Sequence, residues 1–257
     1  QFPDGNDLGT LDTVPVVHTD ITSAQMIKYA SNAFLATRVS FINEVAGVCE
    51  RVGASIQEVA RGIGYDPRIG PSYLSAGIGF GGPCLEKDLK ALIKIAEAND
   101  YEPRVLRAVL GRNDRQVDEV MAKLKKLSGY LLYRKIIAVL GLSFKAGTND
   151  ARNSMSLKVV DRLRKEGARV QAYDPLAMEE SREVQPDVDY CDDPYAAARH
   201  ADAVLFLTDW PEFRDLDFGR LRATMAGNTA IDARNFLDRE ALTGLGFAFE
   251  GIGVKGG

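Results

Sequence analysis

Lys135-Ile136-Ile137-Ala138-Val139-Leu140-Gly141 is the stretch that decides the fold. Its apolar run is unbroken and rich in branched side chains, which is typical of a strand buried on both faces of a parallel sheet. Upstream, apolar residues recur at helical spacing; downstream, short apolar runs alternate with helical segments. The hydrophobic period changes near Ser128-Gly129. We therefore predict an all-helical domain over residues 20–128 and an α/β domain over residues 129–257.

The α/β part repeats the order strand, helix, strand, which predicts a doubly wound parallel sheet. The further strands are predicted at 169–173, 188–191, 203–207, 229–232 and 247–250, and the helices at 154–166, 176–182, 193–200, 216–225 and 238–243. A ligand of such a sheet lies over the C-terminal ends of its strands.

The first strand-to-helix turn, Gly141 to Gly147, lacks the spaced glycine triplet that binds a dinucleotide. Lys145 and Arg152 lie in and after this turn and suit a phosphorylated ligand. Asp174 ends the second strand, where a ribose-binding acid can sit. Without the glycine triplet we interpret Asp174 as a turn residue before Pro175.

The helical part opens on a long helix that we predict from a capping box at Thr22-Ser23-Ala24-Gln25 to about Val52. Its apolar residues cover nearly the whole circumference, which indicates a buried helix. Lys28, Asn32 and Asn43 share one face of it. A buried lysine needs a partner, so we favour a functional role over a lysine whose tip merely reaches solvent.

Shorter helices follow the long one. Ser55 and Glu58 form a second capping box for a helix ending at Gly62 or Gly64, and two more helices are expected from Asp88 to about residue 98 and from Pro103 to about residue 127. Arg68 lies in a loop rich in proline and glycine and suits bidentate phosphate contact, the alternative being a plain surface charge. Residues 1–19 are interpreted as a tail or linker, and the start at Gln1 suggests a piece of a longer protein.

A glycine loop joins these helices, with the sequence Gly77-Ile78-Gly79-Phe80-Gly81-Gly82-Pro83-Cys84-Leu85-Glu86-Lys87-Asp88. Backbone without side chains can approach a ligand closely and adopt positive φ. We predict Asp88 as the N-cap of the following helix. Cys84 then lies near a helix N-terminus with Lys87 close by, an environment that favours a nucleophilic thiolate. The alternative is a glycine turn with an inert, buried cysteine.

Composition excludes several classes of function. The chain has 257 residues, a net charge of −4, three widely spaced cysteines and two histidines. This charge gives no sign of a nucleic-acid surface, and no apolar run reaches membrane-spanning length. The cysteines fit a reducing cytoplasm rather than a disulfide framework, and the absence of a Cys-x-x-Cys pair argues against a metal site. Cys49 and Cys191 are interpreted as small core residues.

Three stretches together resemble one family. They are Met26 through Ala36, Gly79 through Asp88, and Gly141-Leu142-Ser143-Phe144-Lys145 through Ser154, with Leu207-Thr208-Asp209-Trp210-Pro211-Glu212-Phe213 behind them. The order and spacing of these motifs are similar to those of the UDP-glucose/GDP-mannose 6-dehydrogenase family. The resemblance runs from about residue 20 to the C-terminus. It implies a helical dimerisation domain followed by a Rossmann-like UDP-sugar-binding domain, with the family's N-terminal NAD-binding domain absent.

The resemblance also implies roles for individual residues. The family oxidises a sugar C6 alcohol to a carboxylate with two NAD, through a thiohemiacetal and a thioester on a cysteine that matches Cys84. Lys28 and Asn32 match residues that stabilise the C6 oxygen, and Asp88 matches an acid that activates water and orients Lys28. The positions that match substrate contacts are Arg68, Tyr73, Phe80, Gly81 and Lys145, with Arg68 reaching across a homodimer. Arg152 matches a cation directed at the cofactor.

The sequence departs from the family pattern around the cysteine, where Pro83 replaces a small residue and Leu85-Glu86 replaces an aromatic–proline pair. We favour UDP-glucose as substrate because Lys87-Asp88 follows the cysteine as in that branch, with GDP-mannose and UDP-N-acetylmannosamine as alternatives. Two other classes stay open. One is a catalytically silent module that dimerises and binds a nucleotide sugar. The other is a two-domain hydroxyacid dehydrogenase, which would have no need of Cys84.

Overall fold

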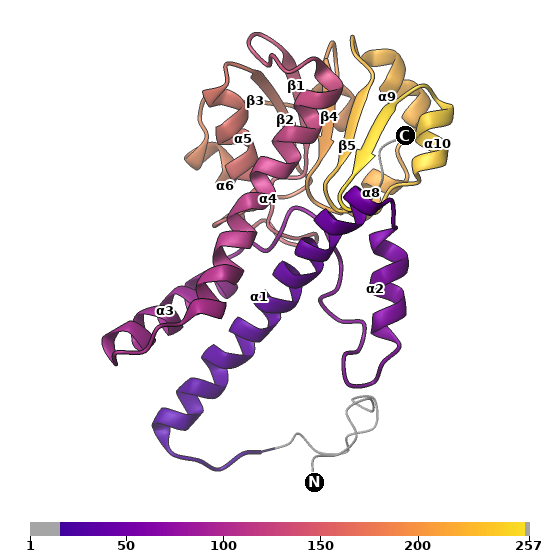
Figure 1. The fold of residues 1–257 in the computed structure, drawn as a ribbon. Coiled ribbons are helices and arrows are strands. Elements are labelled where there is room, and N and C mark those ends of the chain that lie inside the picture. Colours follow the sequence, from indigo (N-terminus) through magenta and orange to yellow (C-terminus); the bar gives the residue numbers. More distant parts are fainter. Residues whose placement is uncertain (1–15, 255–257) are drawn as a thin grey trace.

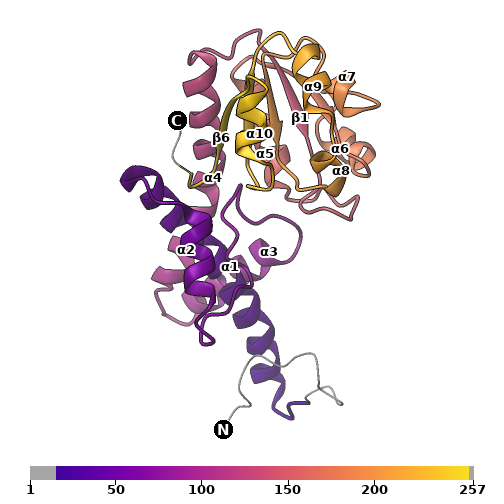
Figure 2. The same ribbon diagram turned by 90° about the vertical axis from the view of Figure 1, so that its right-hand side faces the viewer.

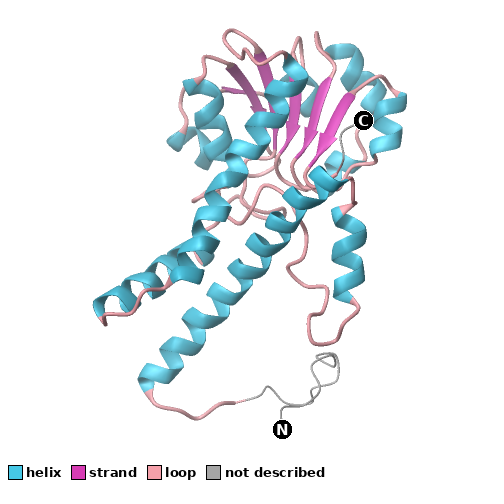
Figure 3. Cartoon of the chain, viewed as in Figure 1, coloured by secondary structure: helices cyan, strands magenta, loops and turns pink. Residues whose placement is uncertain are grey.

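The computed structural model describes residues 16–254, and the predicted tail lies largely outside this range. Its first part is helical and its second part is a parallel sheet with helices on both faces (Figures 1 and 3). The helical part consists of α1 (Ile21–Val52), α2 (Ile56–Gly64), α3 (Leu85–Ala98) and α4 (Arg104–Ser128). This order confirms the predicted fold class. No helix within residues 16–254 is long and apolar enough to cross a lipid bilayer.

The sheet has six parallel strands in the order β3-β2-β1-β4-β5-β6. Their bounds are β1 (Ile136–Leu140), β2 (Arg169–Tyr173), β3 (Asp189–Tyr190), β4 (Ala203–Phe206), β5 (Thr229–Asp232) and β6 (Ala248–Gly251). The central strand β1 pairs with β2 on one side and β4 on the other, so that Leu140 is opposite both Tyr173 and Phe206. The strand order reverses beside β1, and this is where a doubly wound sheet binds its ligand.

Alternate residues of β1 belong to two hydrophobic cores, one on each face of the sheet. Ile137 and Val139 face the side covered by α4 and by α5 (Met155–Lys165), while Ala138 and Leu140 face the opposite side. That opposite side is covered by α7 (Pro194–Ala197), α8 (Pro211–Arg214), α9 (Phe218–Thr224) and α10 (Arg239–Gly244). A further helix, α6 (Met178–Val184), follows β2. Burial on both faces explains why β1 is an uninterrupted apolar run.

Helix α4 connects the two parts of the molecule. Its N-terminal half lies beside α1 and α3, and its C-terminal half runs up along the sheet (Figures 1 and 2). Val120, Met121 and Leu124 accordingly belong to the same buried cluster as the strand residues of β1. One continuous helix therefore sets the placement of the helical part relative to the C-terminal ends of the strands.

Helix α1 departs from its prediction in two ways. It begins at Ile21, and its N-cap is Asp20, whose carboxylate accepts a hydrogen bond from the Ser23 N–H at 2.9 Å, so the predicted cap within Thr22–Gln25 is wrong. The helix is also not buried on all sides. One row of its apolar side chains is exposed: Met26, Ile27, Phe34, Phe41, Val48 and Val52. The apolar residues around α1 thus form two faces: one packs inside the structure, and the other is exposed within residues 16–254.

The remaining elements fall within a few residues of their predicted bounds. The predicted strand 203–207 is β4, and the predicted helix 216–225 is the shorter α9. Helix α8 was not predicted, because its one turn at Pro211 is too short to show a hydrophobic period. The cap at Ser55 is confirmed, since its hydroxyl accepts from the Glu58 N–H, although the Glu58 side chain pairs with Arg61.

Candidate active site

A cleft of about 670 Å³ lies where the glycine loop meets the C-terminal ends of the strands. Residues from both parts of the chain line it, including Asn32, Tyr73, Phe80, Gly81, Cys84, Phe144, Lys145, Arg214, Arg234, Asn235 and Phe236. Six of these were site candidates from the sequence: Asn32, Tyr73, Phe80, Gly81, Cys84 and Lys145. The fold therefore brings together candidates from three separate motifs at the position expected for a ligand of this sheet.

Cys84 is exposed and occupies the N-cap position of α3. This corrects the predicted cap: the helix starts at Leu85, and Asp88 lies in its first turn. The thiol is thus closer to the helix N-terminus than the sequence analysis expected, where backbone N–H groups favour negative charge. The pKa of Arg152 is raised chiefly by its hydrogen bond to Asp150, with a smaller contribution from Cys84.

Asp88 is almost completely buried and joins α3 to α1. Its Oδ2 accepts from Asn32 Nδ2 at 2.5 Å, and its Oδ1 lies 2.9 Å from Lys87 Nζ. Burial alone raises the pKa of Asp88, but the hydrogen bonds from Lys87 and Asn32, with smaller attractions to Lys87 and Lys28, hold it below its ordinary value. Lys28 itself is exposed rather than buried. Asp88 is therefore an ionised acid one turn away from Cys84.

Buried carboxamides hold the glycine loop from the helical side. Asn43 Oδ1 accepts from Gly77 N at 2.9 Å, and Gln116 donates to Gly77 O. Asn113 pairs with both backbone groups of Phe80, accepting from its N at 2.8 Å and donating to its O at 3.0 Å. The loop that leads to Cys84 thus has its backbone polar groups satisfied by rigid helices, which fixes its path.

The same loop packs against the first strand-to-helix turn of the sheet. Gly82 has φ +83°, and a Cβ at this position would lie 2.8 Å from the Phe144 ring. A Cβ at Gly81 would lie 2.7 Å from Asn153 O. These glycines are required because two backbones approach closely. Lys145 Nζ lies 5.5 Å from the centre of the Phe144 ring and adds a positive charge beside the cleft.

Arg234 is a cleft residue that sequence reasoning missed. Its guanidinium donates to three carbonyls: Leu207 O at 3.0 Å, Phe144 O at 3.1 Å and Gly79 O at 3.4 Å. Burial lowers its pKa. The sequence did contain a sign of this role: Arg234 follows the predicted strand 229–232 by two residues, which places a cation at the sheet edge where ligands bind.

Three predicted candidates lie elsewhere. Arg68 is exposed and pairs with Asp66 of its own loop at 2.6 Å, and it does not line the cleft. Arg152 is exposed and pairs with Asp150 at 2.7 Å. Lys28 is exposed, and the one interaction of its side chain with residues 16–254 is an attraction to Asp88. Arg68 can therefore contact a ligand in this cleft only if a second chain brings its own Arg68 there or if the loop of Arg68 moves.

The sheet does not fit NAD. Asp174 is fully buried, and its Oδ2 accepts from Leu142 N, Ser143 N and Trp210 Nε1 at 2.7–3.1 Å. Its Oδ1 accepts from Leu176 N and Ala177 N, so it is the turn residue predicted from the sequence. No lone pair is left for a ribose hydroxyl, and the turn after β1 has no glycine triplet for a pyrophosphate.

Comparison with known proteins assigns both parts of the chain to one family. Residues 22–115 match the central domain of the UDP-glucose/GDP-mannose dehydrogenase family, and residues 138–239 match the UDP binding domain of the same family. The chain is 43% identical over 240 residues to the UDP-glucose 6-dehydrogenase TuaD of Bacillus subtilis, covering 93% of this chain and 52% of the relative. It is 44% identical over 243 residues to the UDP-glucose 6-dehydrogenase of Rhizobium meliloti, covering 95% and 56%. The chain thus spans about half the length of these curated relatives.

Solved structures of nucleotide-sugar dehydrogenases have a similar fold. A UDP-glucose dehydrogenase from Pyrobaculum islandicum superposes with a TM-score of 0.77 at 38% identity, covering 82% of this chain and 48% of that one. A UDP-D-ManNAc dehydrogenase from Pyrococcus horikoshii gives a TM-score of 0.78 at 29% identity, covering 91% and 53%. The two matched domains, in the order seen in the fold, show that the chain belongs to the UDP-glucose/GDP-mannose dehydrogenase family.

Proposed function

We propose that this chain is the substrate-binding and covalent part of an NAD-dependent nucleotide-sugar 6-dehydrogenase that oxidises UDP-glucose to UDP-glucuronate. The observation that carries the proposal is the position of Cys84, at a helix N-cap and in one cleft with Lys145, Arg234 and the glycine loop. UDP-glucose is favoured over UDP-N-acetylmannosamine or GDP-mannose because relatives at 43% and 44% identity are UDP-glucose 6-dehydrogenases. The NAD would be held by residues outside this sheet.

Two cations place the diphosphate. Lys145 and Arg234 both line the cleft over the strand ends, and the positive edge they form suits a nucleoside diphosphate. Tyr73 and Phe80 line the same cleft and offer apolar and aromatic surface to the rest of the ligand. The sugar then extends along the glycine loop toward Cys84, which lines the same cleft.

Cys84 supplies the nucleophile in this proposal. Its Sγ forms a bond to C6 of the aldehyde, the C=O π electrons pass to the oxygen, and this oxygen takes a proton to give a thiohemiacetal. Asn32 stabilises the developing negative charge on the oxygen, and Asp88 keeps it oriented through their hydrogen bond. Lys28, which is exposed and lies outside the cleft in this structure, would join them by turning its side chain toward the cleft, where Asp88 attracts it. The C6 hydride of the alcohol and, in the second oxidation, the C6 hydride of the thiohemiacetal would pass to NAD held outside this sheet, and the thiohemiacetal hydroxyl gives up its proton as the thioester forms. Water then adds to the thioester carbonyl and the C–S bond breaks, which returns the thiol to Cys84 and releases the carboxylate.

We also propose a homodimer formed through α1 and α4. The exposed apolar row of α1 flanks two hollows of about 580 and 500 Å³, lined by residues such as Met26, Leu106, Phe41 and Val109. A second copy would cover this surface and bring the partner's loop at residues 65–73 toward the cleft. The three free cysteines agree with a cytoplasmic location.

A ligand panel tests the proposal directly. We expect UDP-glucose and UDP to raise the melting temperature of the chain more than GDP-mannose or UDP-N-acetylmannosamine, because selective binding stabilises the folded state. UDP-glucose should also slow the alkylation of Cys84, read by peptide mass mapping, while the half-buried Cys191 reacts at an unchanged rate. Equal melting temperatures with all four ligands and no protection of Cys84 would refute the proposed function.

A further inference from the structure

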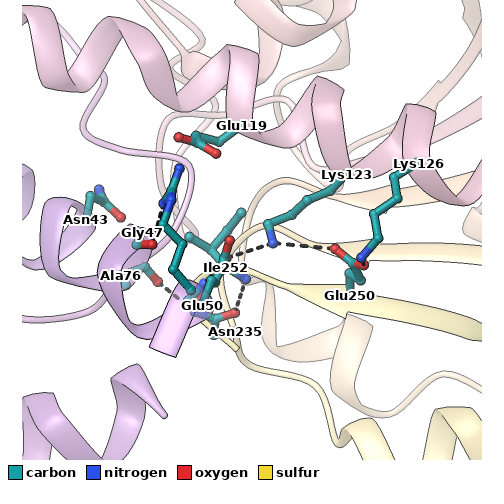
Figure 4. Close-up of polar contacts among 12 residues, drawn as sticks. Asn43, Gly47, Glu50, Ala76, Glu119, Lys123, Lys126, Asn235, Glu250 and Ile252 are labelled. Atoms are coloured by element: carbon teal, nitrogen blue, oxygen red, sulfur yellow. Dashed lines mark hydrogen bonds and ion pairs between the residues drawn. The ribbon is translucent and has the colours of Figure 1, made fainter. Parts of the chain in front are cut away.

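Asn235 lies next to Arg234 and joins three segments that are distant in sequence. Its Nδ2 donates to Ala76 O at 3.1 Å and to Ile252 O at 2.7 Å, and its Oδ1 accepts from Ile252 N at 2.8 Å. Ala76 precedes the glycine loop, and Ile252 follows β6 (Figure 4). One carboxamide thus ties the turn after β5 to both the Cys84 loop and the end of the sheet.

The backbone of Asn235 is specialised for this position. Its φ is +56°, in the left-handed region where asparagine is among the few tolerated residues. Asp232 braces the turn from within, accepting from Arg234 N, Phe236 N and Leu237 N at 2.8–2.9 Å. This turn has no regular secondary structure. Its backbone path, and with it the direction of the Arg234 side chain, therefore depends on the hydrogen bonds of the Asn235 side chain and the Asp232 carboxylate.

The neighbouring contacts make the junction rigid. Glu50 at the end of α1 accepts from Gly253 N at 2.6 Å and pairs with Lys123 at 2.7 Å. Lys123 and Lys126 of α4 both pair with the buried Glu250 of β6, at 3.4 and 2.7 Å (Figure 4). Asn235 binds the segment after β6 at Ile252, and Glu50 and Glu250 anchor this segment to α1 and α4. The segment is therefore held in place independently of Asn235.

The turn after β5 also touches the glycine loop at two further points. Ala233 O accepts from Ile78 N at 2.7 Å, and Arg234 reaches Gly79 O. Three consecutive residues of the turn thus contact Ala76, just before the glycine loop, and Ile78 and Gly79 within it. Of these three residues, Asn235 also binds the anchored segment after β6, through both backbone groups of Ile252.

We infer that Asn235 is a positioning residue, which fixes the Arg234 guanidinium at the diphosphate end of the cleft and keeps the glycine loop in register with it. The inference rests on the proposed nucleotide-sugar site. It concerns neither the nucleophile nor a ligand contact of Asn235. The hydrogen bond between Asn235 and Ala76 couples the nucleotide end of the cleft to the Cys84 end.

Two substitutions separate the side-chain contacts from the backbone geometry. Asn235→Gly removes all three hydrogen bonds and keeps the left-handed backbone unstrained. Asn235→Asp keeps the acceptor for Ile252 N and loses both donors. The matched control is Asn228→Gly, which removes a similar amide–carbonyl bond, from Asn228 Nδ2 to Gly246 O at 3.1 Å, before the start of β5 and away from the cleft.

The measurements are UDP affinity by calorimetry and amide hydrogen exchange, on the full chain. We expect Asn235→Gly and Asn235→Asp to weaken UDP binding about tenfold and to speed exchange at Gly77 to Phe80 by a similar factor. Asn228→Gly should cause neither effect, and it should lower the melting temperature less because it removes one exposed hydrogen bond. Wild-type affinity and exchange in both Asn235 variants would overturn the inference, as would wild-type behaviour of Asn235→Asp alone.

The two proposals fail separately. A wild-type chain that binds neither UDP nor UDP-glucose contradicts the proposed function, and the exchange rates then decide on Asn235 alone. In that case, unchanged exchange at Gly77 to Phe80 in the Asn235 variants overturns the positioning role, and faster exchange supports it.

Discussion

Asn32 and Asp88, 56 residues apart in sequence, lie 2.5 Å apart between Nδ2 and Oδ2 and join α1 to the first turn of α3. Asp88 is 2% exposed, so its carboxylate depends on this contact and on Lys87 for compensation of its charge. Cys84 caps the same turn of α3. The Asn32–Asp88 hydrogen bond therefore fixes the position of the N-terminus of α3, where Cys84 lies.

This pair should show strong coupling in a double-mutant cycle. We expect Asn32→Leu and Asp88→Leu to destabilise the chain individually, and the double variant to recover part of the loss. A coupling free energy of about 1.5–3 kcal/mol is expected because a hydrogen bond to a charged, buried group is involved. Urea unfolding of the four proteins measures it. The cycle for Glu58 and Arg61, an exposed pair at 2.5 Å, serves as control and should give less than about 1 kcal/mol.

Stability should fall in acid partly because of Glu86, the buried residue that departs from the family pattern. Burial raises the pKa of Glu86, yet the hydrogen bond from Lys90 and the attraction of Lys158 outweigh it and lower the pKa from 4.5. A lowered folded-state pKa means that this stabilisation is complete above the ordinary value and is lost as pH falls through the folded value. We expect Glu86→Gln to flatten the free energy of unfolding against pH below about 4.5, whereas the exposed Glu58→Gln changes it little. A Glu86→Gln curve parallel to that of the wild type would contradict this.

The sequence predicted the layers of this fold and six of the residues that line the cleft, since both rest on local signals. The apolar run of β1, the alternation after it and the glycine loop each carry their own period or composition. The start of α3 was misplaced because Asp88 is a good cap by type, and only tertiary packing turns it toward Asn32 instead. Arg234 was missed for the same reason: a lone cation after a strand gains meaning only when the glycine loop folds over it.

Gly82 and Gly147 allow steric contact to be separated from backbone strain. Both have positive φ, at +83° and +77°, but a Cβ on Gly82 would meet the Phe144 ring while one on Gly147 would meet no atom within 4 Å. We expect Gly147→Ala to cost about 1–2 kcal/mol of unfolding free energy and Gly82→Ala about 3 kcal/mol or more. Only Gly82→Ala should also weaken UDP-glucose binding, because it displaces the loop that lines the cleft. Equal losses in both variants would show that the loop does not pack on Phe144 in solution.

The last prediction is that the chain binds a UDP-sugar and produces no NADH. The cleft carries Lys145, Arg234 and Cys84, whereas the sheet has no free acceptor at Asp174, whose oxygens are taken by six backbone and side-chain donors at 2.7–3.1 Å. Hydride transfer needs the nicotinamide held against the sugar, and positioning of this kind contributes on the order of 7–11 kcal/mol. Without it no measurable rate should remain. Calorimetry should show heat with UDP-glucose and none with NAD, and a full-length relative serves as the positive control in an NADH absorbance assay. NADH formation by the chain itself, or NAD binding that Asp174→Ala abolishes, would mean that this sheet holds the cofactor.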